Sequence, residues 1–239
     1  SIIFTHLDIF RMTSFGQFFK RLLGAIILIV VAFHLLVAAL LLMWKFQPIN
    51  NSMFMLTHRL TGGSVTQEWV EYDAIAKSAK QAAIVSEDST FSQHHGFDFK
   101  GIKDAQKKNE ASGKASAGGS TITQQLAKNL FLTSHRSYVR KADEAVITLM
   151  IETLWDKQRI LTAYLNVAEF GNGIYGVEAA ANHYFDKSAD NLNRDESALL
   201  ISMLTNPKYY QDNQGDRQLR NKQRIVKKRM KNAVLPQSD

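Results

Sequence analysis

The hydrophobic and polar positions of the chain follow a helical rhythm over most of its length. From about residue 66 onward, apolar residues recur at spacings of three and four, and the alternation typical of strands is scarce. Only 3 prolines interrupt the pattern. Helices are therefore expected at residues 74–85, 121–132, 137–154, 157–166, 177–184, 194–205 and 214–234. The pattern predicts a mainly α domain.

A different pattern fills residues 22–44, an apolar run whose polar side chain is His34. Its length matches the roughly 20 residues that a helix needs to cross the hydrocarbon core of a bilayer. A cleaved signal peptide would have a shorter apolar core and a small-residue cleavage site, so the run predicts an uncleaved transmembrane anchor. A neutral histidine is tolerated in a single span, and we assign it no function.

The anchor divides the chain into four predicted parts. These are an N-terminal cytoplasmic segment, a transmembrane helix, a membrane-proximal linker and a soluble domain, at 1–21, 22–44, 45–65 and 66–239. Three basic residues, Arg11, Lys20 and Arg21, precede the span, and Lys45 and Arg59 follow it. This small excess favours a cytoplasmic N-terminus, which places the soluble domain outside.

One stretch of the soluble domain breaks the helical rhythm. Residues 107–120 read KKNEASGKASAGGS, in which small and polar side chains leave little apolar surface to bury. We therefore predict a mobile loop there, directly before the helix expected at 121–132.

Composition narrows the class of protein further. With 239 residues, 45% of them hydrophobic, the chain can bury one sizeable core in addition to the anchor. The absence of cysteine excludes a disulfide framework and a cysteine-ligated zinc site. A formal net charge of +7 raises the question of nucleic acid binding.

Much of the positive charge lies in the C-terminal stretch RQLRNKQRIVKKRM, at residues 217–230. Leu219, Val226, Met230 and Ala233 recur there at helical spacing, and no aromatic residue interleaves the charges as in a single-strand binder. We interpret the stretch as an amphipathic helix packed on the domain, with its basic face toward acidic lipid or solvent. No nucleic acid partner is expected.

The first stretch with unusual chemistry is VSEDSTFSQHHGFDF, at residues 85–99. Glu87 and Asp88 form an acidic pair with apolar neighbours on both sides, among them Phe91. Apolar surroundings destabilise the ionised form of a carboxylate and raise its pKa. The stretch therefore predicts that Glu87 lies beside a core, and it leaves open what an ionisable group does there.

A second polar pattern opens the helix expected at 121–132. Ser120 or Thr121 is a good N-cap, and Thr121, Gln125 and Lys128 share one helix face. A double glycine before a helix N-terminus also makes an anion site, to which Lys128 adds a cation. A solvated helix face is the plain alternative.

Charged residues of both signs begin the following helix. Arg140 and Lys141 stand four and three residues before Glu144, so an ordinary ion-pair cluster worth roughly 0.3 kcal/mol per pair explains them if they are taken alone. Together with the two preceding patterns, they supply cations and a further carboxylate.

In this order the patterns resemble the motifs of the glycosyltransferase domain of bacterial peptidoglycan synthases, the lysozyme-like family that polymerises lipid II. The first motif, Glu-Asp-x-x-Phe-x-x-His-x-Gly, is matched at residues 87–96. The second, Gly-x-Ser-Thr-Ile-Thr-Gln-Gln, is matched at residues 118–125, with Lys128 and Asn129 after it.

Further motifs of the family follow along the chain. Arg-Lys-x-x-Glu is matched at 140–144, and Lys-x-x-Ile-Leu-x-x-Tyr-Leu-Asn at 157–166. The fifth motif, a basic helix, is matched only loosely at 224–230. The first four together are highly specific, and they run through nearly the whole soluble part.

The resemblance implies a two-lobed, lysozyme-like, mainly α domain and a membrane-anchored, monofunctional peptidoglycan glycosyltransferase. The penicillin-binding motifs Ser-x-x-Lys and Lys-Thr-Gly of the bifunctional relatives are absent from the sequence. The expected reaction joins the sugars of lipid II into β-1,4-linked glycan strands and releases polyprenyl pyrophosphate.

The resemblance also implies roles for individual residues. Glu87 would be the general base, and Glu144 would orient the basic residues or help to hold a divalent cation. The substrate would be bound by Asp88, His94, Ser120, Thr121, Gln125, Lys128, Asn129, Arg136, Arg140 and Lys141. Asp88 is expected to orient the first motif rather than to react, and His94 to fix its loop.

The same resemblance gives the expected ligands and location. Lipid II, the growing glycan strand and the membrane are the partners, together with other cell-wall synthesis or division proteins. A divalent cation, Mg or Mn, would assist the pyrophosphate, and no organic cofactor is expected. The protein would lie in the cytoplasmic (inner) membrane with its catalytic domain on the periplasmic face, and it would be a target of moenomycin.

Two other functions fit parts of the sequence. A lytic, lysozyme-like enzyme would also use one catalytic glutamate in a helical domain, but it has no use for several cations around a pyrophosphate. A non-enzymatic, membrane-tethered scaffold could bind glycan or lipid through the same basic surface.

Overall fold

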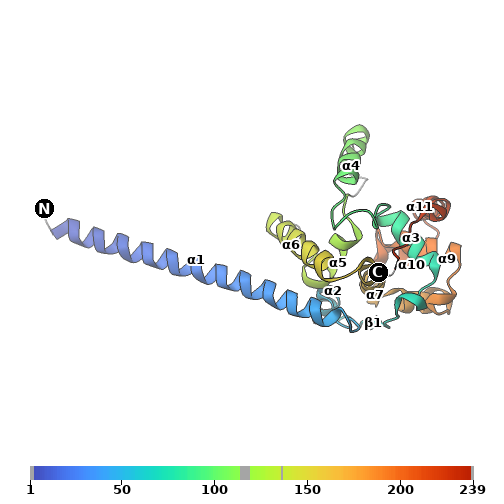
Figure 1. Ribbon diagram of the computed structural model, residues 1–239, viewed down its shortest axis with the longest axis horizontal. Coiled ribbons are helices and arrows are strands. Elements are labelled where there is room, and N and C mark those ends of the chain that lie inside the picture. The colour runs from blue at the N-terminus through green and yellow to red at the C-terminus, as the bar shows by residue number, and fades with distance from the viewer. Residues whose placement is uncertain (1–2, 114–118, 136, 238–239) are drawn as a thin grey trace. The chain divides into compact units, whose positions relative to one another are not determined.

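The computed structural model describes residues 3–113, 119–135 and 137–237. The chain divides into two units, Ser1–Met43 and Trp44–Asp239. The first unit holds almost all of α1, Ile3–Trp44, a single continuous helix (Figure 1). Its part Gly16–Trp44 is long and apolar enough to cross a membrane, which fits a single-pass anchor.

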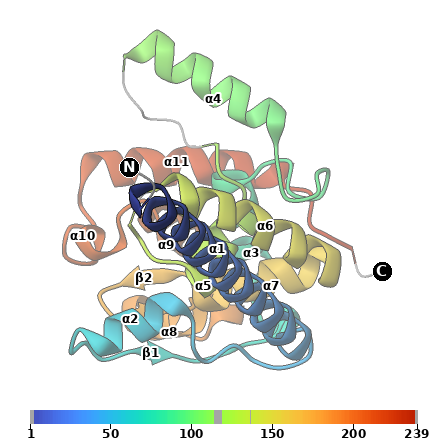
Figure 2. The same ribbon diagram turned by 90° about the vertical axis from the view of Figure 1, so that its left-hand side faces the viewer.

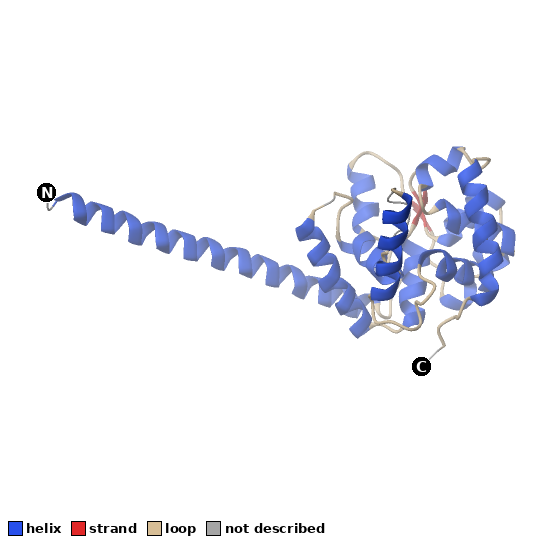
Figure 3. Ribbon diagram, turned by 90° about the horizontal axis from the view of Figure 1, so that it is seen from above, coloured by secondary structure: helices blue, strands red, loops and turns tan. Residues whose placement is uncertain are grey.

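The second unit is built mainly of helices, as Figure 3 shows, and confirms the predicted mainly α class. The helices are α2 Met53–Leu60, α3 Lys77–Glu87, α4 Phe99–Ser112, α5 Ile122–Phe131, α6 Tyr138–Leu154, α7 Lys157–Val167, α8 Val177–Phe185, α9 Arg194–Met203, α10 Pro207–Asp212 and α11 Arg217–Arg229. Short 3₁₀ turns lie at Tyr72–Ala74, Ala189–Asn191 and Met230–Asn232.

Two groups of helices form the core. In one group α3 packs against α9 and α11, and in the other α5 packs against α2, α6 and α7. Figure 2 shows α4 standing apart from both groups, in agreement with the exposure of Phe99 and Ile102 on it. Fully buried aliphatic residues, such as Ile84 of α3 and Leu126 of α5, fill the two groups.

A small sheet closes one side of the unit. Its strands, β1 Thr66–Gln67, β2 Glu169–Gly171 and β3 Ile174–Tyr175, have the order β1-β3-β2. Strand β1 runs parallel to β3, whereas β2 runs antiparallel to it. Strands of two and three residues carry too few positions for alternation, so the sequence pattern did not reveal them.

The predicted loop at 107–120 is wrong over its first part, because residues 107–112 belong to helix α4. Lys, Gln, Ala and Glu are good helix formers even where they bury nothing. The Asp98 side chain caps the helix, which ends at Gly113 with φ 63°. Gly119 and Ser120 lie outside regular structure, and residues 114–118 of the predicted loop lie outside the described residues.

The segment 45–65, predicted as a linker, contains helix α2. Ser52 caps this helix, Met55 is fully buried, and the helix packs against α5. Arg159 of α7 donates hydrogen bonds to the backbone carbonyls of Trp44 and Gln47. The first residues of the second unit are therefore hydrogen-bonded to α7.

Asn166, the last residue of the Tyr-Leu-Asn motif, is a structural residue. Its fully buried side chain accepts a hydrogen bond from Val70 N at 2.8 Å and donates to Val70 O at 2.8 Å. It also donates to Thr162 O within α7 at 2.8 Å. These bonds attach the segment before α3 to α7.

We expect Asn166→Ala to lower the free energy of unfolding by about 2 kcal/mol, because it leaves Val70 N and O, and Thr162 O inside α7, without their side-chain partner in a place that is at least partly buried. Thermal and denaturant unfolding of the full chain in detergent, followed by circular dichroism, measures this. Asn191→Ala is the control, since its bonds to Ser188 and Asp190 lie at the surface, and a change within about 0.5 kcal/mol is expected. Equal losses in both variants would contradict the role of Asn166.

Candidate active site

A polar cleft of about 390 Å³ lies where α2, α5 and α6 meet. It is lined by Phe54, Ser120, Gln124, Gln125, Lys128, Ser134, Arg140, Lys141 and Glu144. Five residues predicted to bind substrate thus line the same cleft as Glu144: Ser120, Gln125, Lys128, Arg140 and Lys141.

Glu87 is the last residue of α3, and its carboxylate is held by polar groups from three elements. Ser86 Oγ donates to Oε1 at 2.6 Å, and Lys222 Nζ of α11 lies 3.3 Å from the same oxygen. Gln125 Nε2 of α5 donates to Oε2 at 3.2 Å. With 14% of its side chain exposed, Glu87 lies beside the cleft, in contact with the wall residue Gln125.

Glu87 has polar partners that the expectation of apolar surroundings did not include. Phe91 is fully buried, but its ring lies under the ammonium of Lys157, 4.5 Å from the ring centroid. Lys157 in turn is paired with Glu152 at 2.8 Å, and Thr123 donates to the same carboxylate oxygen at 2.5 Å. Phe91 therefore joins the first motif to α5, α6 and α7, and Glu87 is hydrogen-bonded by Ser86, Gln125 and Lys222.

Gln125 links Glu87 to a buried tyrosine. While its Nε2 donates to Glu87, its Oε1 accepts from Tyr164 Oη at 3.1 Å. Burial raises the pKa of Tyr164 well above its usual value, and the nearby carboxylates of Glu87 and Asp88 raise it further. The tyrosine therefore stays protonated and keeps the Gln125 amide in the orientation that donates to Glu87.

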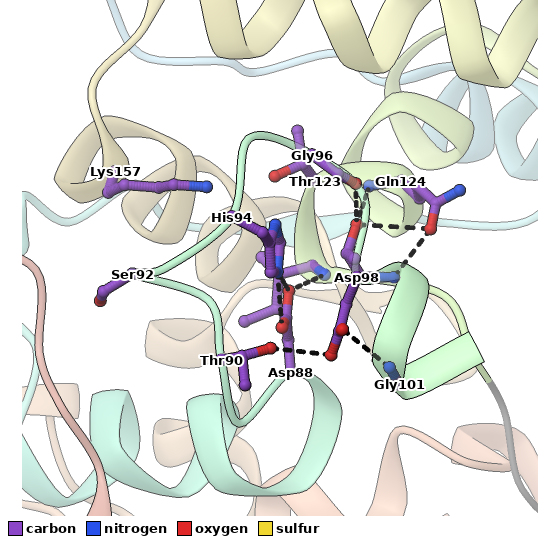
Figure 4. Close-up of polar contacts among 12 residues, drawn as sticks. Asp88, Thr90, Ser92, His94, Gly96, Asp98, Gly101, Thr123, Gln124 and Lys157 are labelled. Atoms are coloured by element: carbon purple, nitrogen blue, oxygen red, sulfur yellow. Dashed lines mark hydrogen bonds and ion pairs between the residues drawn. The ribbon is translucent and has the colours of Figure 1, made fainter. Parts of the chain in front are cut away.

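Asp88 fixes the loop that follows Glu87 (Figure 4). Its buried carboxylate accepts a hydrogen bond from Ile122 N, in the first turn of α5, at 3.1 Å. His94 Nε2 lies 2.9 and 3.0 Å from the two carboxylate oxygens. Both side chains face the interior, so the geometry gives Asp88 and His94 positions suited to holding the loop rather than to touching a substrate.

Thr121 likewise faces the interior. It caps α5, forming a capping box with Gln124, and its hydroxyl donates to Gly96 O at 2.7 Å. The first two motifs are thus bonded to each other at two places, through Asp88 and through Thr121. On the same loop Asp98 accepts from Thr90 and Gly101, and the backbone bond from Gly101 is the main cause that lowers the pKa of Asp98.

Glu144 holds two of the cations at the cleft. Arg140 Nη1 donates to one carboxylate oxygen at 2.8 Å, and Lys141 Nζ pairs with the other. These are the spacings of an ordinary helix ion-pair cluster, but Glu144 is 3% exposed and lines the cleft, so the cluster is more than a solvated helix face. Arg136 lies outside the described residues.

Two neighbouring residues of α5 that were predicted to bind substrate lie in different places. Lys128 lines the cleft, with its ammonium 5.8 Å from the centroid of the Phe54 ring. Asn129, the next residue of α5, is buried and is absent from the cleft wall.

Sequence reasoning missed Lys222, Tyr164, Phe54 and Ser134 at this site. Lys222 stands three residues after the apolar Leu219, a spacing that places it on the inner side of α11 and that could have singled it out. Phe54 lies before the first motif and Ser134 between the second and the third, where no pattern marks them.

The carboxylates of the site do not form a ready-made metal site. Among the described residues, no group of three or more His, Asp or Glu side chains could hold a metal ion. Glu87 and Glu144 each have a cationic partner instead. These donors do not fit a resident divalent cation, and we derive no step through one.

Comparisons with known proteins place the chain in a family. The sequence model of the Transglycosylase family matches residues 55–231. A "Biosynthetic peptidoglycan transglycosylase" of Acinetobacter baylyi is 45% identical over 223 residues, which cover 91% of this chain and 100% of the relative. Proteins of the same name from Acinetobacter baumannii and Dechloromonas aromatica are 43% and 42% identical, over 90% and 94% of this chain and 95% and 100% of the relatives. The chain belongs to the transglycosylase family and is a glycosyltransferase.

We expect Gly96→Ala to disturb the junction of the first two motifs. Gly96 has φ +90°, and an added Cβ would lie 2.7 Å from Thr148 Cγ2, so both backbone strain and a clash oppose the methyl group. The expected loss is about 1–3 kcal/mol of unfolding free energy, with a matching fall in activity. Thermal unfolding and product formation measure these.

Gly215→Ala is the control for this variant, because nothing lies within 4 Å of an added Cβ there. Its unfolding free energy should change by no more than about 0.5 kcal/mol. If Gly96→Ala were as stable and active as Gly215→Ala, the junction would be less constrained than the geometry indicates.

Proposed function

We propose that this enzyme polymerises lipid II into β-1,4-linked glycan strands of peptidoglycan and releases polyprenyl pyrophosphate. The observation that carries the proposal is a partly exposed carboxylate, Glu87, bonded to the wall of a cleft that also presents Lys128, Arg140 and Lys141. The name that the relatives share, biosynthetic peptidoglycan transglycosylase, supports the substrate class.

The proposed reaction is an inverting displacement at the anomeric carbon of an α-linked donor sugar. The acceptor hydroxyl gives its proton to Glu87 as its oxygen forms the new bond on the β face. The bond between the anomeric carbon and the pyrophosphate oxygen breaks, and its electron pair leaves with the pyrophosphate. Glu87 needs no second carboxylic acid opposite it, because pyrophosphate is a good leaving group without a proton.

The cations of the cleft would stabilise the charge that develops on the leaving group. Lys128, Arg140 and Lys141 approach the cleft from two helices, and hydrogen bonds between charged partners are the stronger kind. Glu144 would hold Arg140 and Lys141 in place before the substrate arrives.

A lytic function is the second candidate, since a single glutamate beside a cleft could also protonate a glycosidic oxygen. The cations of the cleft, Lys128, Arg140 and Lys141, favour an anionic leaving group over a neutral sugar. We therefore prefer synthesis to cleavage.

Glu87→Gln tests the role of the carboxylate. The amide keeps the shape but cannot accept the proton, so glycan synthesis from labelled lipid II should fall by about 100-fold or more. Glu68→Gln, at an exposed position, should retain the wild-type rate. Both variants should keep the wild-type melting temperature, and gel separation of the labelled strands gives rate and length together.

Near-normal synthesis by folded Glu87→Gln would remove Glu87 from the base role. Release of soluble fragments from preformed peptidoglycan by the wild type, without strand synthesis, would favour the lytic candidate. Binding of lipid II with neither product would leave a scaffold function.

The membrane orientation gives a separate prediction. We expect the unit Trp44–Asp239 to lie on the outer face of the cytoplasmic membrane, where flipped lipid II is available. Protease added to intact spheroplasts should then degrade this unit and leave a cytoplasmic marker protein intact. Survival of the unit while known outer-face proteins are digested would show that the orientation is reversed.

A further inference from the structure

The basic helix α11 brings one of its lysines to the candidate base. Lys222 Nζ lies 3.3 Å from Glu87 Oε1 and donates to Thr205 Oγ1 at 2.6 Å. The sequence separation of Glu87 and Lys222 is 135 residues, so the contact depends on how α11 packs on the domain.

The packing of α11 explains why Lys222 is the residue that reaches Glu87. Leu219 and Val226 are buried where the helix packs against α9 and α3, and Lys222 shares their side of the helix. Its side chain is 32% exposed, whereas Arg224, Lys227 and Lys228 are fully on the exposed face. Lys227 pairs with Asp195, away from the site.

We propose that Lys222 is a positioning residue for the general base, an inference that rests on the proposed function of Glu87. The Lys222 ammonium and the Ser86 hydroxyl donate to Oε1, and Gln125 donates to Oε2. Both oxygens are therefore bonded, and the carboxylate group is fixed in one orientation. A general base that is already oriented toward the acceptor hydroxyl loses less conformational entropy in reaching the transition state, and this raises the rate of the chemical step.

The alternative is that Lys222 binds the substrate directly, as a further cation for a phosphate group. The two roles differ in what they change. A positioning residue acts on the chemical step and alters kcat, whereas a residue that binds substrate and transition state equally alters KM. Because Thr205 accepts a hydrogen bond from Lys222, a substitution of Thr205 also perturbs the contact between Lys222 and Glu87.

The experiment compares Lys222→Met, Lys222→Arg and the matched control Lys227→Met in the full chain in detergent. Steady-state synthesis from labelled lipid II gives kcat and KM, and thermal unfolding gives the folded fraction. We expect Lys222→Met to lower kcat by about tenfold or more with KM within about twofold of wild type. Lys222→Arg should recover most of the rate, and Lys227→Met should match the wild type.

A binding measurement separates the two roles in the absence of turnover. In the Glu87→Gln background, adding Lys222→Met should leave the Kd for labelled lipid II within about threefold. A rise of about tenfold or more would overturn the proposal and assign Lys222 to substrate binding. If Lys222→Met is poorly folded, Thr205→Val provides the test, with an expected fall in kcat and no change in Kd.

The outcomes also separate this inference from the proposed function. If the wild type polymerises lipid II and Lys222→Met keeps its kcat, the positioning role fails while the function stands. If the wild type makes no strands from lipid II, the proposed function fails and this inference fails with it.

Discussion

The site depends on one buried carboxylate at the start of α5. Asp88 accepts the Ile122 N–H and contacts His94, and a negative charge is favoured at the N-terminal end of a helix. Because α3 ends at Glu87, this contact fixes the exit of the chain from α3 against the entry into α5. The distance between Glu87 and Gln125, and with it the link from Glu87 to the cleft, follows from that junction.

Around this junction the site is built from helix ends and from ion pairs. These ion pairs fix the directions of side chains rather than add stability. Glu152 with Lys157, and Glu144 with Arg140, are pairs in which the carboxylate is nearly buried. Removing charges from water offsets much of their attraction, so such pairs add little net stability. They do fix directions, however, and cleft residues from two helices need fixed directions to meet one ligand.

Much of the site could be predicted from the sequence, because its residues occur in local patterns. Helical spacing predicted α5 and α6, and the resemblance to the glycosyltransferase motifs grouped Gln125, Lys128, Arg140 and Lys141 as substrate-binding residues, which line one cleft. The surroundings of Glu87 could not be predicted in this way, since Phe91, its neighbour in sequence, turns to Lys157, and Lys222 arrives from α11. Helix α4 was missed because its residues favour a helix by propensity while burying little, so periodicity gave no signal.

The structure holds two carboxylates, Glu144 on the cleft wall and Glu87 beside it, in different ways. Glu144 is 3% exposed and pairs with both Arg140 and Lys141, which come from its own helix α6. Its two oxygens are therefore occupied by cations, and it fixes the directions of both. Glu87 has one ammonium partner, Lys222, whose side chain is 32% exposed, and two neutral donors, Ser86 and Gln125. These three partners come from α3, α5 and α11, so the position of Glu87 depends on the packing of the whole domain, whereas the Glu144 cluster is set within a single helix.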